Sequence, residues 1–178
     1  MKKFIWVFSL IILATVISAC GNGNDTTKKE ENKKISLNQY KKIFKQTINK
    51  NKGNAEIKIG DLEKVDTGRY SMPLNSDGSM ALFIEVDKDK NFKNAKVAAT
   101  SEALEIYNDE LHIAFNSLLK SMDKDLNENQ QKAVLKKLGI TNSTELTDKI
   151  EVYTIDDIRF TYYSKIENNS VILEGEYK

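Results

Sequence analysis

The chain has 178 residues, with 27 basic and 26 acidic side chains, one histidine and one cysteine. This length suits a single domain that can bury its own core without disulfides or metals. The near balance of charge argues against general nucleic-acid binding, which needs a basic surface, and a lone cysteine excludes an intrachain disulfide.

The first nineteen residues have the pattern of a secretory signal. Lys2 and Lys3 give a positive start, and a mostly apolar run continues from Phe4 to Ala19. The run is shorter than the ~20 apolar residues that a membrane-spanning helix needs. The sequence therefore predicts a cleaved leader over residues 1–19, with a permanent transmembrane anchor as the alternative.

The end of the leader is its most specific part. Ile17, Ser18 and Ala19 stand directly before Cys20. A branched apolar residue, two small residues and a cysteine in this order resemble the lipobox of bacterial lipoproteins, although Ile17 stands where leucine is commoner. The resemblance covers the leader alone. It implies that a signal peptidase recognises Ile17, Ser18 and Ala19 and cuts before Cys20, whose nucleophilic sulfur carries a covalent diacylglycerol.

A diacylglyceryl group supplies two acyl chains. One chain anchors a protein only marginally, because each buried methylene contributes about 0.8 kcal/mol, whereas two anchor it stably. The resemblance therefore implies a protein held by lipid on the outer face of the cell membrane.

Basic-residue usage indicates the kind of source. Arg69 and Arg159 are the only arginines, so lysine makes up the other 25 of the 27 basic residues. Abundant Lys, Asn and Ile are expected of a chain read from an A+T-rich genome. We interpret the source as a Gram-positive bacterium of low G+C content.

Residues 20–34 are expected to be a tether. After Cys20 this segment has no apolar side chain, so it cannot offset the entropy cost of ordering. A flexible chain of this length spans roughly 20 Å. The remaining residues, 35–178, are predicted to form a single domain.

Apolar spacing predicts the elements of that domain. Helical periodicity indicates helices at about 36–50, 101–122 and 126–138 and a short helical turn near 144–150. Alternating apolar residues indicate strands at 55–59, 69–72, 80–86 and 93–100 and a closing hairpin of 158–166 and 171–177. Helices and strands do not alternate along the chain, so we expect an α+β fold, an antiparallel sheet with helices packed on one face.

The chain shows no recognisable catalytic constellation. His112 is expected on an exposed helix face with Asp109 and Asn116, opposite Leu111. Asp109 and His112 supply two metal ligands, too few for a specific site. With Cys20 acylated and the histidine exposed, Cys-His catalysis is excluded and a Ser-His-Asp triad is disfavoured. No catalytic residue and no metal site is predicted, and the only cofactor expected is the lipid on Cys20.

Two segments begin like calcium-binding loops. Residues 87–91 and 123–129 both carry acidic and amide side chains at alternate positions, but Phe92 and Glu128 stand where each loop needs glycine. We interpret the first segment as a hairpin turn and the second as the start of a helix.

Arg159, Tyr163 and Lys165 are the candidate binding face. Strand alternation should turn Tyr163 away from the side that Tyr162 occupies and place it with Arg159 and Lys165. Tyrosine and arginine are enriched at the centres of protein interfaces. An ordinary surface tyrosine of a sheet is the alternative.

The leading interpretation is a membrane-anchored lipoprotein with a small, non-enzymatic binding domain. Its expected partners are the membrane, through the lipid, and an envelope or extracellular protein. No nucleic-acid partner is expected, because removal of Lys2 and Lys3 with the leader leaves 25 basic against 26 acidic residues. Two alternatives stay open: a carboxylate-dependent enzyme acting on cell-envelope or extracellular substrates, and a precursor whose leader yields a peptide pheromone from Leu10–Ala19.

Overall fold

The computed structural model describes residues 35–140 and 146–178. All of them belong to one unit, Lys33–Lys178. The expected leader (1–19) and tether (20–34) lie outside the described residues, and so do Ile17, Ser18, Ala19 and Cys20. No helix within the described ranges is long and apolar enough to span a membrane.

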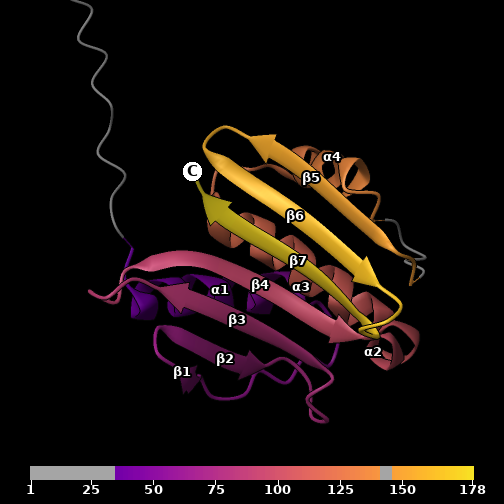
Figure 1. Ribbon diagram of the computed structural model, residues 1–178, viewed down its shortest axis with the longest axis horizontal. Coiled ribbons are helices and arrows are strands. Elements are labelled where there is room, and N and C mark those ends of the chain that lie inside the picture. Colours follow the sequence, from indigo (N-terminus) through magenta and orange to yellow (C-terminus); the bar gives the residue numbers. More distant parts are fainter. Residues whose placement is uncertain (1–34, 141–145) are drawn as a thin grey trace, which may run out of the picture. The chain divides into compact units, whose positions relative to one another are not determined.

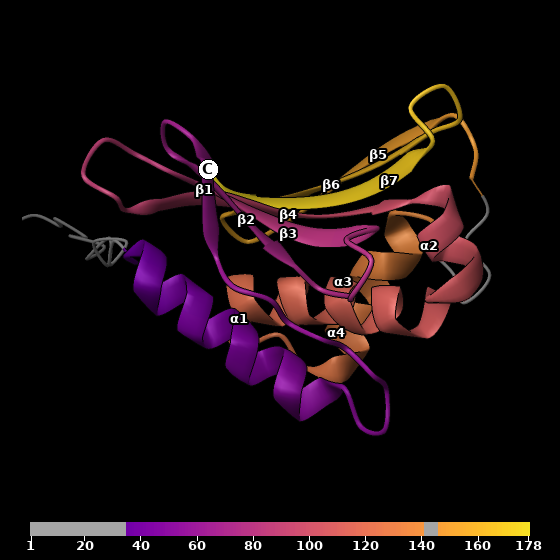
Figure 2. The ribbon, with the colours of Figure 1, turned by 90° about the horizontal axis from the view of Figure 1, so that it is seen from below.

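Seven strands form one antiparallel sheet in the order β1-β2-β3-β4-β7-β6-β5 (Figure 1). The strands are β1 Glu63–Asp66, β2 Arg69–Pro73, β3 Met80–Val86, β4 Phe92–Thr100, β5 Lys149–Ile155, β6 Ile158–Lys165 and β7 Ser170–Tyr177. The helices are α1 Leu37–Asn51, α2 Ser101–Ile106, α3 Asn108–Met122 and α4 Glu128–Lys137. The helices lie on one side of the sheet (Figure 2), which confirms the predicted α+β architecture. We call that side the covered face and the opposite side the free face.

Helix α1 begins where its sequence predicts. The Ser36 hydroxyl accepts a hydrogen bond from the Gln39 amide at 3.3 Å, and the Gln39 side chain accepts one from the Ser36 amide at 2.9 Å. This reciprocal capping box satisfies two amides that have no partner within the helix. The predicted apolar stripe is buried and packs against α3.

The long helix predicted from Ser101 is wrong in one respect, because it breaks at Tyr107. This residue has φ −122° and ψ 36°, outside the helical range, and it separates α2 from α3. The Tyr107 hydroxyl donates to Asp77 Oδ2 at 3.0 Å, in the loop before β3. Apolar periodicity continues through the break, so the pattern alone could not reveal it.

Three predicted strands, 69–72, 80–86 and 93–100, are confirmed as β2, β3 and β4. The strand predicted at 55–59 is wrong: this segment is irregular, although Ile57 is buried. The helical turn predicted near 144–150 is also wrong over 146–150, where β5 begins at Lys149, and 141–145 lies outside the described residues. Strands β1 and β5 were not predicted, and they are the two edges of the sheet.

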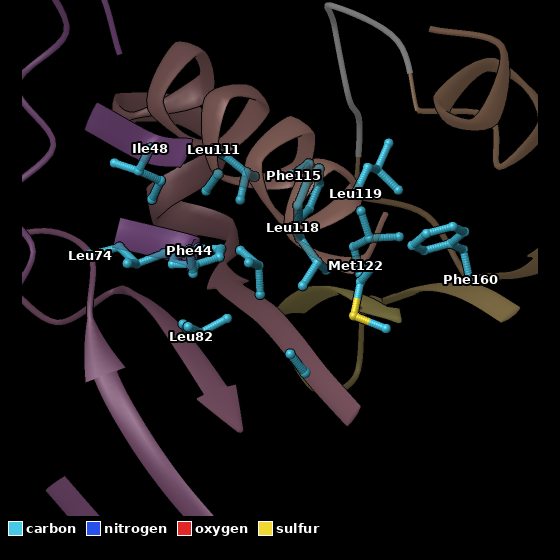
Figure 3. Packing of buried hydrophobic residues seen from close by; sticks show 14 of the residues in the cluster. Phe44, Ile48, Leu74, Leu82, Leu111, Phe115, Leu118, Leu119, Met122 and Phe160 are labelled. Carbon is cyan, nitrogen blue, oxygen red and sulfur yellow. The ribbon is translucent and has the colours of Figure 1, made fainter. Parts of the chain in front are cut away.

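The core fills the space between the helices and the covered face (Figure 3). Phe115 of α3 meets Tyr162 of β6 edge-to-face, with ring centroids 6.4 Å apart. Phe160 pairs across the strands with Gly175 of β7, and its ring occupies the space above that glycine. Aromatic rings therefore cover β6 and β7 on this side.

The start of α1 is fixed to the β3–β4 turn. The Tyr40 ring stacks on Phe92 with centroids 4.0 Å apart, and the Tyr40 hydroxyl hydrogen-bonds Ser121 Oγ at 2.9 Å. In the turn, one carboxylate oxygen of Asp87 accepts from the amides of Asp89 and Asn91, at 2.9 and 2.8 Å. Residues 87–91 are thus the hairpin turn that we predicted.

Candidate binding surface

The pairing register aligns the free-face side chains in three rows that cross the sheet. The apolar row contains Ile150, Tyr163, Ile172, Ala98, Ala81 and Pro73. The middle row is mixed and contains Val152, Thr161, Glu174, Lys96, Phe83 and Ser71. The charged row contains Thr154, Arg159, Glu176, Asn94, Glu85 and Arg69. The free face therefore changes from apolar to charged along the strands.

Strand β6 brings the three predicted residues to this face. Tyr162 is 2% exposed on the covered face, whereas Tyr163 is half-buried on the other side, as alternation predicts. Arg159 lies in the charged row, Tyr163 in the apolar row and Lys165 at the end of the strand. Along β6, Arg159 and Tyr163 are four residues apart, and Tyr163 and Lys165 are two apart. Neighbouring rows differ by two residues of each strand, so they lie roughly 7 Å apart.

An apolar corner surrounds Tyr163. We use this name for Ile150, Val152 and Tyr163, which lie on β5 and β6. Ile150 pairs directly with Tyr163, and 56% of Ile150 and 57% of Val152 is exposed. Directly opposed side chains in a sheet lie about 5 Å apart at Cβ, so these residues form one contiguous surface. Large exposed aliphatic groups beside an aromatic are typical of a protein contact site.

The basic side chains of the free face all have acidic partners. Arg159 forms an ion pair with Glu176, and Lys165 Nζ lies 4.0 Å from Asp148. Lys96 Nζ lies 3.3 Å from Glu174 and 3.7 Å from Glu85. These ion pairs neutralise the basic side chains Arg159, Lys165 and Lys96 and leave the apolar corner uncovered.

The far end of the charged row shows the same pairing. Arg69 hydrogen-bonds Asp66 of β1, and this contact holds the pKa of the Asp66 carboxyl below its usual value. The charged row is therefore a set of intramolecular ion pairs, which orient the groups that an incoming partner would meet.

Ile150 and Val152 were missed by the sequence analysis. Both belong to β5, which has exposed residues on both of its faces. This strand therefore lacks the strict alternation of apolar and polar residues that is typical of a half-buried strand. The signal that could have found them is the alternation of Ile150, Val152 and Thr154 just before the strand predicted at 158–166.

His112 is half-buried, so the prediction of an exposed histidine is wrong. The end of α1 and one side of α4 lie beside α3 there. Asn51 Nδ2 donates to Ser117 Oγ at 3.2 Å, and His112 shares a groove with residues of α4. The His112 carbonyl accepts from Asn116 Nδ2 at 2.9 Å. Helical periodicity identified the Leu111 stripe but not the second helix on the opposite side.

The second calcium-like segment is the start of α4, as predicted. Asn127 caps the helix by accepting from the Gln130 amide at 3.0 Å, and Asp123 accepts from the Asp125 amide at 2.8 Å. Within residues 35–140 and 146–178 no group of three or more His, Cys, Asp or Glu side chains is arranged to hold a metal ion.

Comparisons of this chain with protein-family models, with curated proteins and with solved structures find no match. The function must therefore be argued from the residues themselves.

Proposed function

We propose that this chain is a lipoprotein anchored on the outer face of the cell membrane, whose domain binds an envelope or extracellular protein through the free face of its sheet. The observation that carries the binding role is the apolar corner, in which the exposed Ile150 and Val152 lie beside the half-buried Tyr163, on the same face as Arg159.

The leader supports the anchor. Two lysines, an apolar run and the order Ile17, Ser18, Ala19, Cys20 resemble a lipoprotein signal. Two acyl chains on Cys20 would hold the domain at the membrane.

The free face supports recognition of a protein. Contact with a partner would remove the exposed aliphatic side chains of the apolar corner from water, and the charged row offers oriented polar groups on the same face. Specific interfaces combine apolar contact with polar groups in this way. Tyr163 contributes both a ring and a hydroxyl, so it can make apolar and polar contacts with one partner.

Two experiments test the two parts separately. For the anchor, mass spectrometry of the protein isolated from its source membranes should find a diacylglyceryl group on an N-terminal Cys20. Cys20→Ala should move the protein out of the membrane fraction. An unmodified cysteine, or an unchanged membrane fraction for Cys20→Ala, would contradict the anchor.

For the binding face, crosslinking on intact cells should capture one specific protein with the wild-type chain. Tyr163→Ala, Ile150→Asp and Val152→Asp should each reduce capture by about tenfold, equivalent to about 1.4 kcal/mol. Glu151→Ala is the matched control, because Glu151 is exposed on the same strand but points to the opposite face. Equal capture by the wild type and all three variants would show that the partner uses another surface.

A further inference from the structure

A groove of about 640 Å³ opens on the helical side of the domain, away from the free face. Residues from the end of α1, from α3 and from α4 line it, together with Ile140 just after α4. Its volume lies within the range of about 300–1,000 Å³ that is usual for small-molecule sites. The groove is therefore large enough for a small organic ligand.

The inner part of the groove is apolar. Leu135 and Ile140 are 7% and 4% exposed, and Ile113 is half-buried beside them. The neighbouring wall is polar but fixed, since the buried Gln131 donates through Nε2 to the Leu126 carbonyl at 2.9 Å. Ile113 is the most accessible of these aliphatic side chains, so a ligand with an apolar body would cover it, and the fixed wall would need little ordering.

The outer part of the groove is cationic. Lys50, Lys132 and Lys136 line it, all three exposed, against Glu128 as the one carboxylate among the lining residues. Within the described chain none of these lysines forms an ion pair, whereas Lys96, Lys165 and Arg159 on the free face all do. The groove thus keeps positive charge that the fold does not neutralise.

We propose that this groove binds a small organic anion with an apolar body. The apolar part packs on Ile113, Leu135 and Ile140, and the acid group lies among Lys50, Lys132 and Lys136. The proposal does not depend on the free face or on the anchor.

The test uses the full chain in nanodiscs of zwitterionic lipid, with empty nanodiscs as the background. Equilibrium dialysis measures binding of 4-phenylbutyrate, its neutral amide 4-phenylbutyramide, and inorganic phosphate. We expect the carboxylate to bind about tenfold more tightly than the amide, which lacks the charge, and also than phosphate, which lacks the apolar body. Raising the salt concentration should weaken carboxylate binding, because exposed lysines are screened.

Variants locate the site. Lys132→Gln combined with Lys136→Gln should weaken 4-phenylbutyrate binding by about tenfold, because the substitutions remove two exposed positive charges that attract the carboxylate. Lys137→Gln is the matched control, since Lys137 is exposed on the same helix but does not line the groove. Ile113→Ser should weaken the carboxylate and the amide alike and leave phosphate unchanged.

Four results would overturn the proposal. They are no measurable binding of 4-phenylbutyrate, equal affinity for the amide, equal affinity for phosphate, and equal losses from the Lys132/Lys136 pair and from Lys137→Gln. Circular dichroism of each variant checks that the fold is retained, so a loss of binding is not mistaken for unfolding.

Discussion

The two faces of β6 differ in what they contribute. Phe160 and Tyr162 are 0% and 2% exposed and belong to the core, whereas Arg159 is half-exposed in an ion pair and Tyr163 lies beside exposed aliphatic side chains. Fully burying a large apolar side chain contributes about 1.5–3 kcal/mol, whereas an exposed ion pair contributes about 0–1 kcal/mol. Along this one strand, the residues of the covered face therefore stabilise the fold, and the residues between them form a surface that is available for recognition.

The largest expected effect follows from truncating Phe160 and Tyr163, which lie on opposite faces of β6, in turn. Phe160→Ala should lower the free energy of unfolding by about 3–5 kcal/mol, because it leaves a cavity under the helices. Tyr163→Ala should lower it by less than about 1 kcal/mol, because Tyr163 is only partly buried, on the face that no helix covers. Urea denaturation of the two variants measures both values. Comparable losses would mean that the free face is part of the core.

A second substitution tests how tightly the covered face is packed. A methyl group at Gly175 would lie 3.0 Å from Met122 Cγ and 3.1 Å from Phe160 Cε1. Gly175→Ala should therefore destabilise the fold by about 1–3 kcal/mol through overpacking. Its neighbour Glu174 points to the free face, and Glu174→Ala on the same strand should cost less. A stabilising Gly175→Ala would show that Met122 and Phe160 shift without strain.

Tyr40 gives a smaller effect with a pH signature. Its hydroxyl meets Ser121 Oγ in the core, and burial raises the pKa of this phenol well above its usual 10.0. Tyr40→Phe should cost about 1 kcal/mol at neutral pH, the usual net value of one hydrogen bond.

The sign of the pH dependence follows from that raised pKa. The neutral phenol is favoured in the fold, so its contribution is complete below pH 10 and is lost as the pH rises above 10. The loss of stability above pH 10 should be shallower in Tyr40→Phe than in the wild type. Burial also raises the pKa values of Tyr162 and Tyr177, so part of the loss remains. Parallel pH–stability curves would contradict the role of Tyr40.

Covered-face elements could be predicted from the sequence, because burial on one side imposes a period. The stripe of α1 and the alternation of β3 and β4 are both confirmed. The edge strands β1 and β5 could not be predicted from the sequence, since neither buries a regular set of side chains. The break occurs at Tyr107, whose hydroxyl contacts Asp77 thirty residues away, and no local pattern encodes such a contact.

The candidate surfaces divide in the same way. Alternation alone placed Arg159, Tyr163 and Lys165 on one side of β6, whereas Ile150 and Val152 joined them only through the pairing of β5 with β6. The groove needs three helices brought together from different parts of the chain, so its lysines had no signal in the sequence. The sequence predicts which residues of one helix or strand share a face, whereas a surface built from several elements can be identified only once the fold is known.

The smallest expected effect is at the centre of the free face. Lys96 lies between Glu174 and Glu85, and the three side chains are 32%, 16% and 29% exposed. Lys96→Gln should cost at most about 1 kcal/mol at low salt, since partly solvated ion pairs contribute little. The difference should shrink at high salt, where such pairs are screened. Urea denaturation at two salt concentrations measures both. A cost above about 2 kcal/mol that salt does not change would mean that this network is packed like the covered face, and the division between the two faces would fail.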